Sequence, residues 1–267
     1  MLLLYLQCVA IKQSVSWWCF ANRGINDTAL LQSIKSIGYE AVELIDVALF
    51  QQARDCGLTI ATHQGHQSID RGLNDLTQHA RIECELHETL ALAQKYEILN
   101  LVVFSGNRRP GLSEEEGWEN TAIGLKRIAK AAEDAGVTLI LELLNSKRDH
   151  RGYQCDRTAW GVEVCCSVAS PRVKILYDIY HMQIMEGDLI ETIGEHHKVF
   201  GHYHTAGVPG RNDLDAVQEI NYPGVLRAIA QTNYDGYIGH EFIPKSDPVA
   251  ALKAAWDLCN NSLNIAS

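Results

Sequence analysis

The stretch V-K-I-L-Y-D-I-Y-H, residues 173–181, contains a short apolar, β-branched run that ends in a carboxylate. The run, residues 173–177, predicts a strand that is buried on both faces, because strands covered by helices on both sides of a sheet are apolar throughout. Asp178 lies at the carboxyl end of this strand, and His181 follows three residues later. Parallel α/β folds bind ligands and catalyse reactions at the carboxyl ends of their strands. The stretch therefore predicts a parallel sheet and marks a candidate site.

The rest of the chain repeats this pattern of strand and helix with short breaks, which is typical of βα units. The predicted strands are 14–20, 41–45, 58–63, 99–104, 137–144, 173–177, 199–204 and 237–242. The predicted helices are 27–37, a short helix that ends at Cys56, 73–95, 113–135, 158–168, 189–196, 223–232 and 248–258. Asp27 is a candidate N-cap, and Ser113 with Glu116 predicts a capping box.

Eight strands and eight helices in alternation predict an α/β protein with a single (β/α)8 barrel of the TIM type. A doubly wound open sheet is the alternative, but it rarely needs eight repeats, and the first strand-to-helix turn lacks a G-x-G-x-x-G motif. We assign residues 12–267 to one catalytic barrel domain. Residues 1–11 are assigned to an N-terminal extension, with disorder as one expectation. Its apolar segment lacks the preceding basic region of a signal peptide and is too short to span a membrane.

Charge and cysteine content limit the classes of function. The chain has 267 residues and a formal net charge of −10, and no run of Lys or Arg is longer than two. This charge disfavours a nucleic-acid partner, because a negative protein is repelled by phosphates. The eight cysteines are scattered without a C-x-x-C pair, which indicates reduced thiols rather than a disulfide scaffold. We therefore expect a cytoplasmic protein that binds neither nucleic acid nor a membrane.

Four consecutive predicted strands end in residues that can bind a metal ion. These residues are Glu142 in L-I-L-E-L-L-N, Asp178, His204 in G-H-Y-H-T-A-G and Glu241 in G-H-E-F-I-P. Each of them alone has an ordinary structural explanation, such as a salt bridge. Three carboxylates at one barrel mouth, however, would repel one another without a cation. The set therefore predicts a divalent metal site, and its oxygen-rich ligands favour Mg²⁺, Mn²⁺ or Co²⁺, with Zn²⁺ as an alternative.

Two further histidines lie next to these ligands in the sequence. We expect only one of His202 and His204 to face the barrel axis, and His204 is the better ligand because it is nearer the carboxyl end of its strand. His202 would then be structural or support the ligand. His240 alternates with Glu241 along its strand, so we leave it out of the site.

Five segments together resemble a known superfamily: L-E-L-L-N-S-K, L-Y-D-I-Y-H-M-Q, H-Y-H-T-A-G-V-P-G-R, E-I-N-Y-P and G-H-E-F. They are similar to the sugar isomerase/epimerase superfamily with xylose isomerase-like barrels, and most similar to hydroxypyruvate isomerases. The resemblance covers nearly the whole chain after Lys12. It implies that Glu142, Asp178, His204 and Glu241 hold a divalent metal ion and that the two glutamates are the acid/base pair. It also implies a homo-oligomer.

The reaction implied by the resemblance is the isomerisation of hydroxypyruvate to tartronate semialdehyde through an enediolate, by proton transfer between two glutamates. A ketose 3-epimerase or another sugar isomerase is the alternative, because return of the proton to the same carbon gives epimerisation. The chain has Lys147 and Arg148 where epimerases tend to have a second glutamate, and His204 where bacterial hydroxypyruvate isomerases often have glutamine. The substrate therefore stays open. An endonuclease IV-like nuclease and a non-catalytic sugar-binding protein are less favoured, since basic stretches are missing and both glutamates are present.

Other strand ends and loops supply candidate residues for binding a hydroxy-carbonyl or sugar substrate. The resemblance implies that His181 contacts a substrate oxygen near the metal; capping of the next helix is the alternative. Arg211, in A-G-V-P-G-R, could bind a substrate carboxylate or be a solvated loop charge. Trp17 or Trp18 could line the pocket, although such tryptophans are more often core residues. The opposite wall is predicted to contain His63, His66, Asn107, Arg108 and Glu43.

Overall fold

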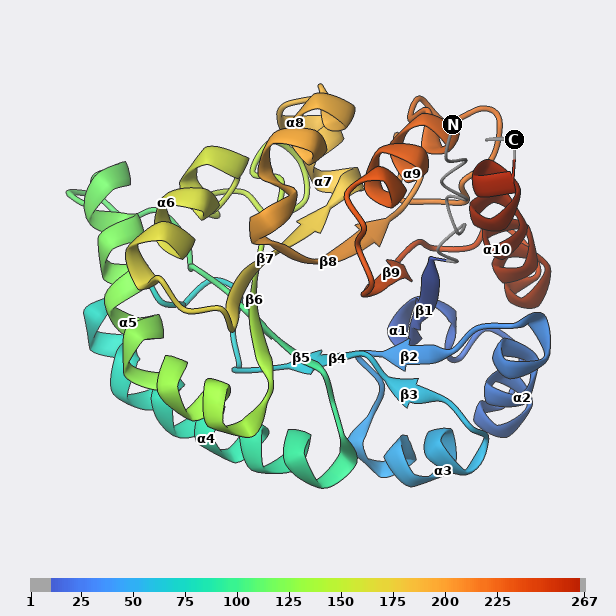
Figure 1. The fold of residues 1–267 in the computed structure, drawn as a ribbon, viewed down its shortest axis with the longest axis horizontal. Helices are drawn as coiled ribbons and strands as arrows, with labels where there is room; N and C mark the ends of the chain where they lie inside the picture. The colour runs from blue at the N-terminus through green and yellow to red at the C-terminus, as the bar shows by residue number, and fades with distance from the viewer. Residues whose placement is uncertain (1–10, 265–267) are drawn as a thin grey trace, which may run out of the picture.

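In the computed structural model, which describes residues 11–264, nine short strands form one parallel sheet that curls into a ring (Figure 1). The strand order is β3-β2-β1-β9-β8-β7-β6-β5-β4, and each neighbouring pair is parallel. The strands are β1 (Lys12–Ser16), β2 (Ala41–Glu43), β3 (Thr59–Ile60), β4 (Thr62–Gln64), β5 (Asn100–Val103), β6 (Thr138–Glu142), β7 (Val173–Asp178), β8 (Phe200–Thr205) and β9 (Tyr237–His240).

One strand of the barrel is interrupted, and this interruption closes the ring. The predicted strand 58–63 is divided at Ala61 into β3, which pairs with β2, and β4, which pairs with β5. The N–H of Ala61 donates to the carbonyl of Val42 (2.9 Å), and the carbonyl of Ala61 accepts from the N–H of Asn100 (3.1 Å). The interrupted strand therefore joins both of its neighbours, and the predicted (β/α)8 barrel is confirmed.

Helices cover the outside of the ring (Figure 1). The α-helices are α1 (Trp17–Phe20), α2 (Asp27–Ile37), α3 (Phe50–Asp55), α4 (His79–Tyr96), α5 (Glu114–Ala135), α6 (Thr158–Val168), α7 (Ile179–Met185), α8 (Leu189–His196), α9 (Tyr222–Gln231) and α10 (Pro248–Asn264). Short 3-10 turns at Val47–Leu49, Leu76–Gln78 and His197–Val199 precede α3, α4 and β8. The capping box of Ser113 and Glu116 is present at the start of α5. Asn26 rather than Asp27 caps α2, because its side chain accepts from the N–H of Ala29.

Two elements differ from the sequence prediction near the barrel mouth. The predicted strand 14–20 ends at Ser16, and the helical turn α1 follows it, which buries Trp17 and leaves Trp18 about half exposed at the mouth. The short helix α7 was not predicted; the side chain of Asp178 caps it by accepting from the N–H of His181 (3.0 Å). Both elements turn the chain directly after a strand, where a side chain can lie over the barrel.

Most barrel strands are buried on both faces, as their apolar sequences predict, whereas in β4 His63 is half-buried and Gln64 is exposed. Apolar side chains pack between the sheet and the helices, whereas the barrel interior also contains buried polar side chains such as Ser14, Thr62 and His202. Ile11, the last residue of the predicted extension, is buried in the core, and residues 1–10 lie outside the described residues. Within residues 11–264, no helix combines the length and the apolar character that crossing a membrane requires.

Candidate active site

The ends of four consecutive strands bring four metal-binding side chains together. Glu142 ends β6, Asp178 ends β7, His204 lies in β8 and Glu241 directly follows β9. Asp178 pairs with His204 in the sheet register, so their side chains start from the same level of the barrel. One ligand atom from each of the four residues lies within 4.8 Å of the others, and all four residues are buried. The predicted convergence of these residues is therefore present in the fold.

The cluster has more negative charge than its neighbours neutralise. The guanidinium of Arg211 pairs with Glu241 and lies 3.8 Å from the carboxylate of Asp178. Burial raises the pKa of Asp178 above its usual range, although Arg211 opposes this shift. Burial also acts to raise the pKa of Glu241, but His204 and Arg211 outweigh it and hold that pKa well below its usual range. One arginine does not compensate three clustered carboxylates, so a divalent cation would relieve their repulsion.

His204 presents an unpaired nitrogen to these carboxylates. Its Nδ1 is buried without a hydrogen-bond partner among the described residues, and lies 3.1 Å from Glu241 Oε2 and 3.7 Å from Glu142 Oε1. Burial disfavours a charge on the ring, but Glu241 and Glu43 raise the pKa of His204 well above its ordinary value. The surroundings thus favour a positive charge at Nδ1, which a proton or a metal ion can supply. The donor set of three carboxylates and one imidazole fits a divalent cation.

The two glutamates are held differently. Glu241 Oε1 accepts hydrogen bonds from the indole of Trp18 (2.9 Å) and the hydroxyl of Ser16 (3.2 Å), and its other oxygen pairs with Arg211. No described residue donates a hydrogen bond to the carboxylate of Glu142, whose one ion-pair contact among the described residues is with His204, at 3.7 Å. Glu241 is therefore fixed in place, whereas Glu142 can reorient.

His181 is held as a neutral ring beside the metal-binding cluster. The carbonyl oxygen of the Asn145 side chain accepts from two backbone N–H groups, those of Arg148 and Asp149, which fixes the orientation of its amide. The amide nitrogen therefore faces His181 Nδ1, at 2.6 Å, and Nδ1 must accept. Burial, assisted by Arg211, lowers the pKa of His181 well below its ordinary value. A neutral ring that accepts at Nδ1 carries its proton at Nε2, which lies 3.6 Å from the carboxylate of Asp178. Arg211 Nη1, which can only donate, lies 3.3 Å from the same nitrogen and does not accept this proton.

A cavity of about 450 Å³ opens at this end of the barrel. Glu142, Arg211 and Glu241 contribute charged side chains to its lining, and Leu44, Ile69 and Phe104 contribute an apolar part. This volume falls in the range of about 300–1,000 Å³ that is typical of small-molecule sites. The cavity therefore offers metal ligands, a cation and an apolar wall to a small polar substrate.

The structure places the predicted opposite wall differently. Glu43 is fully buried beneath the cavity, and His63 points away from it, with its ring 5.2 Å from that of Phe50. The interruption at Ala61 places Thr62 and Gln64 on the inner face of the strand, so the intervening His63 faces outward. Gln64 lines the cavity instead.

The loop residues of that wall have structural partners. His66 accepts the N–H of Phe104 at Nε2 (2.9 Å) and lies 3.0 Å from the carbonyl of Gln67 through Nδ1. Asn107 donates to Asp70 (3.0 Å). Arg108 is paired with Glu114 and Asp156. None of these three residues lines the cavity.

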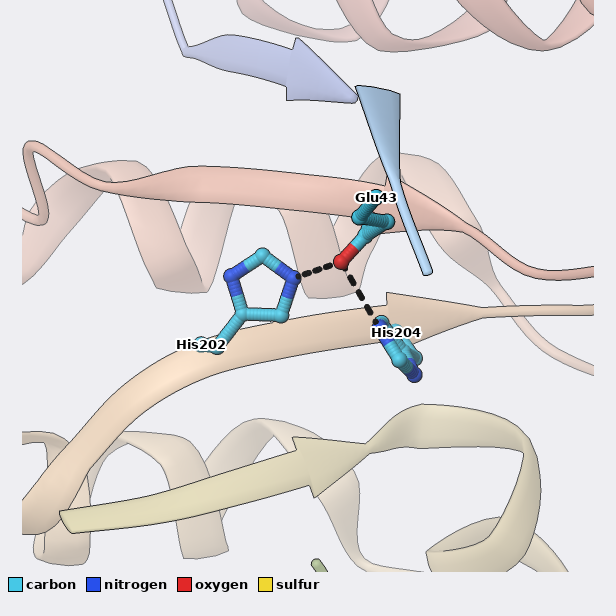
Figure 2. Close-up of side chains that lie close together, drawn as sticks. All are labelled: Glu43, His202 and His204. Carbon is cyan, nitrogen blue, oxygen red and sulfur yellow. Dashed lines mark hydrogen bonds and ion pairs between the residues drawn. The ribbon is translucent and has the colours of Figure 1, made fainter. Parts of the chain in front are cut away.

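The prediction that only one of His202 and His204 faces the barrel axis is wrong. Residues two apart in a strand point to the same face. Both imidazoles contact the carboxylate of Glu43 inside the barrel, as Figure 2 shows. His240 points outward and bonds to Thr205 and Gln13, so its exclusion from the site agrees with its placement.

Sequence reasoning assigned no role to Asn145 and ranked Trp18 low. Asn145 lies three residues after Glu142, at the end of the same apolar run, so its position at a strand end was a usable signal. The contact of Trp18 with Glu241 depends on the helical turn α1, which the pattern of residues 14–20 does not reveal.

Acid sensitivity is one measurable consequence of the buried His66. Burial lowers the pKa of His66 to about 4 from 6.5, although the Gln67 carbonyl opposes this. Below about pH 6.5, the unfolded chain binds a proton at His66 that the folded chain does not bind. The free energy of unfolding therefore falls by about 3 kcal/mol as the pH drops from about 6.5 to 4. Glutamine can replace both hydrogen bonds of His66 without titrating.

We expect His66→Gln to have nearly the wild-type melting temperature at neutral pH and a higher melting temperature than wild type at acidic pH. Parallel curves for both proteins would contradict this.

Comparisons with known proteins were consistent with the barrel. Residues 31–260 match the family described as xylose isomerase-like TIM barrel. The 2-oxo-tetronate isomerase of Cupriavidus necator is 38% identical over 124 residues, 46% of this chain and 47% of the relative, so this match spans about half of either protein. The putative hydroxypyruvate isomerase of Homo sapiens is 26% identical over 247 residues, 86% of this chain and 89% of the relative. These names indicate an isomerase.

The fold also matches solved structures. The AP endonuclease, family 2, from Brucella melitensis superimposes with a TM-score of 0.82 at 21% identity, over 92% of this chain and 98% of that chain. At this level of identity the likeness shows a shared fold alone.

Proposed function

Because the chain belongs to the xylose isomerase-like TIM barrel family, we propose that it is a metal-dependent isomerase that converts hydroxypyruvate into tartronate semialdehyde. The observation that carries this proposal is the convergence of three buried carboxylates and the unpaired Nδ1 of His204 at one cavity. The names of the curated relatives support the reaction class and a hydroxylated oxo acid as the substrate. Cytoplasmic location, a homo-oligomer and the lack of a nucleic-acid partner stay predictions.

We assign the binding of one divalent cation to Glu142, Asp178, His204 and Glu241, with Mg²⁺, Mn²⁺ or Co²⁺ favoured and Zn²⁺ as the alternative. When bound, such a cation acts as a Lewis acid on the substrate carbonyl and acidifies the neighbouring C–H. The protein itself supplies a cation in Arg211, which lines the cavity and could pair with the substrate carboxylate. His181 is fully buried beside Asp178 and does not itself line the cavity, and its Nε2–H would serve a substrate oxygen that reaches the metal ligands.

The two glutamates would serve as the acid/base pair. One carboxylate takes a proton from the carbon that carries the hydroxyl, which gives an enediolate, and a proton is delivered to the former carbonyl carbon. The hydroxyl proton moves to the other oxygen, so the reaction is balanced without a co-reactant. Glu142, which no described residue holds by a hydrogen bond, has the freedom to approach the substrate, whereas Glu241 is fixed.

A larger substrate is the alternative that the cavity favours. Its volume of about 450 Å³ leaves room for more than a three-carbon acid. A four-carbon oxo acid such as 2-oxo-tetronate, or a ketose that is epimerised when the proton returns to the same carbon, would use the same carboxylates.

The test is turnover by metal-stripped protein before and after Mn²⁺ or Mg²⁺ is restored, with the product followed by proton NMR. We expect conversion of hydroxypyruvate only with the metal. Conversion of 2-oxo-tetronate or of a ketohexose alone would support a metal-dependent isomerase with a substrate other than hydroxypyruvate. Equal turnover with and without metal, or none for any of these substrates in a protein that fails to bind Mn²⁺, would overturn the proposal.

Arg211 offers a test of carboxylate recognition. Its guanidinium lies 5.5 Å from the rings of both Trp18 and Tyr180, which hold it at the cavity. Lysine keeps the charge but loses the planar pair of donors. We expect Arg211→Lys to raise KM for hydroxypyruvate by about 10- to 100-fold, the value of a charged hydrogen bond, and to change KM for the uncharged dihydroxyacetone far less. Equal changes in KM for both substrates would contradict carboxylate binding by Arg211. The Mn²⁺ affinity of the variant is measured as well, to distinguish weaker substrate binding from weaker metal binding.

A further inference from the structure

We propose that Glu43 is a positioning residue that orients His204, so that the Nδ1 lone pair of this imidazole faces the cation site. The inference rests on the proposed function in one respect, namely that His204 is a metal ligand. It reassigns Glu43 from the predicted pocket wall to the layer beneath the metal ligands. Metal-binding histidines commonly donate their second ring N–H to a carboxylate, which fixes the ring.

The geometry around Glu43 converges on its two carboxylate oxygens (Figure 2). Oε2 lies 3.2 Å from His204 Nε2, 2.8 Å from His202 Nε2 and 2.8 Å from the hydroxyl of Thr62. Oε1 accepts from the hydroxyl of Ser14 at 2.8 Å. The side chain of Glu43 is fully buried, so these four groups, which come from three other strands, are its described partners. Such a set satisfies a buried carboxylate without solvent.

The chemistry of the acceptor determines which nitrogen of His204 carries a proton. An ionised carboxylate only accepts hydrogen bonds, so the ring nitrogen that faces it must be an N–H. With the proton at Nε2, a neutral His204 has its lone pair at Nδ1. That nitrogen faces Glu142 and Glu241 on the cavity side and has no hydrogen-bond partner among the described residues. One imidazole thus links the buried carboxylate to the cation site.

The position of Glu43 is also fixed by packing. Gly239 in β9 faces its carboxylate, and a Cβ at that position would lie 1.8 Å from Glu43 Oε1. Any side chain at residue 239 would therefore displace the carboxylate. Because Gly239 has no side chain, the carboxylate of Glu43 can occupy the position from which it contacts His204.

A rival explanation is that the inner cluster itself binds the metal. Ligand atoms of Glu43, His202 and His204 also lie within 4.8 Å of one another, and His202 Nδ1 is buried and unpaired among the described residues. The hydrogen bonds already made by Glu43 argue against this, because a metal would have to replace donors that satisfy its carboxylate. His202 separates the two explanations, since it is a ligand only in the rival one.

The experiment measures Mn²⁺ affinity by electron paramagnetic resonance, without reference to turnover. We expect Glu43→Gln to weaken Mn²⁺ binding by about 10- to 100-fold, the usual effect of losing such a carboxylate partner. Ser14→Ala removes a hydrogen bond from the other oxygen of Glu43 and is the matched control, with nearly wild-type affinity. His202→Gln should also bind Mn²⁺ nearly as well as wild type, whereas Glu142→Gln should not. Melting curves establish that each variant is folded.

A second readout uses the wild-type protein and remains decisive if Glu43→Gln does not fold. Nitrogen-15 NMR of the Mg²⁺-loaded protein, with His204 assigned by His204→Gln, should show a proton at Nε2 and none at Nδ1. In Glu43→Gln the Nε2–H signal should move upfield as it loses its carboxylate acceptor. A proton at Nδ1 in the wild type, unchanged Mn²⁺ affinity in folded Glu43→Gln, or loss of binding in His202→Gln would each overturn the inference. Wild-type protein without Mn²⁺ affinity would overturn the proposed function as well.

Discussion

Glu142→Gln and Glu241→Gln are each expected to lower kcat/KM for hydroxypyruvate by about 1,000-fold at saturating metal, because a positioned acid or base contributes about 10²–10⁴-fold. Glutamine has nearly the shape of glutamate but cannot take a proton. Glu142→Gln disturbs no hydrogen bond among the described residues, so its melting temperature should stay close to wild type. Glu241→Gln removes the charge that pairs with Arg211, so it should also lower stability.

Deuterium exchange separates the two glutamates. In D₂O, the variant that keeps the base should exchange the C3 hydrogen of hydroxypyruvate without forming product, whereas the variant that lacks the base should do neither. The freedom of Glu142 predicts that Glu142→Gln is the variant without exchange. Glu83→Gln, which changes a surface ion pair with Arg127, is the control and should have nearly wild-type turnover. A Glu142→Gln protein that binds Mn²⁺ and turns over like wild type would contradict the assignment.

The site could be predicted where apolar runs end in ionisable residues. Glu142 and Asp178 stand at the ends of buried strands, and a buried carboxylate in such a place needs a partner. Parallel strands bring their carboxyl ends to one side of the barrel, so their convergence follows from the fold class. The positions of Glu142 and Asp178 could therefore be predicted from the order of the strands and from the need of a buried carboxylate for a partner.

The residues of the opposite cavity wall could not be predicted, because they depend on which side chains of the interrupted strand point into the barrel. The interruption at Ala61 sets which of residues 62–64 point inward, and this interruption arises from how one strand is shared between two neighbours. Single-strand alternation does not contain that information, so His63 was placed inside and Gln64 was not considered. Likewise, the position of Trp18 over Glu241 depends on a helical turn in a segment whose apolar pattern favours a strand.

The interior of the barrel was mispredicted for a simpler reason. His202 and His204 are two residues apart, which places them on one face, and both reach Glu43. The pairing partner is 159 residues away in the sequence from His202, so no local pattern reveals it. Residues that orient a ligand are set by such distant contacts, whereas the ligands themselves stand at strand ends.

His181 is expected to be the next most sensitive position. We expect His181→Gln to lower kcat for hydroxypyruvate by about 100-fold, with a smaller change in KM, because a donor aimed at a developing oxyanion acts mainly in the transition state. The donor must be Nε2–H of a neutral ring, and Asn145 ensures this by donating to Nδ1 at 2.6 Å. Burial, with Arg211 second, lowers the pKa of His181, so the ring stays neutral throughout the physiological range.

Asn145→Asp tests this arrangement without removing the histidine. A carboxylate at residue 145 can still accept from the N–H groups of Arg148 and Asp149, but it would accept from His181 Nδ1 rather than donate to it. The ring would then be doubly protonated or carry its proton on the wrong nitrogen. We expect a loss of kcat close to that of His181→Gln and a proton at Nδ1 in nitrogen-15 NMR. Asp149→Asn, which removes the charge of the other acceptor of the Asn145 amide but keeps an acceptor oxygen, is the matched control. If Asn145→Asp kept the wild-type kcat although its NMR spectrum showed the proton at Nδ1, His181 would not act as a donor, and its burial beside Asp178 would be explained by the capping of α7 alone.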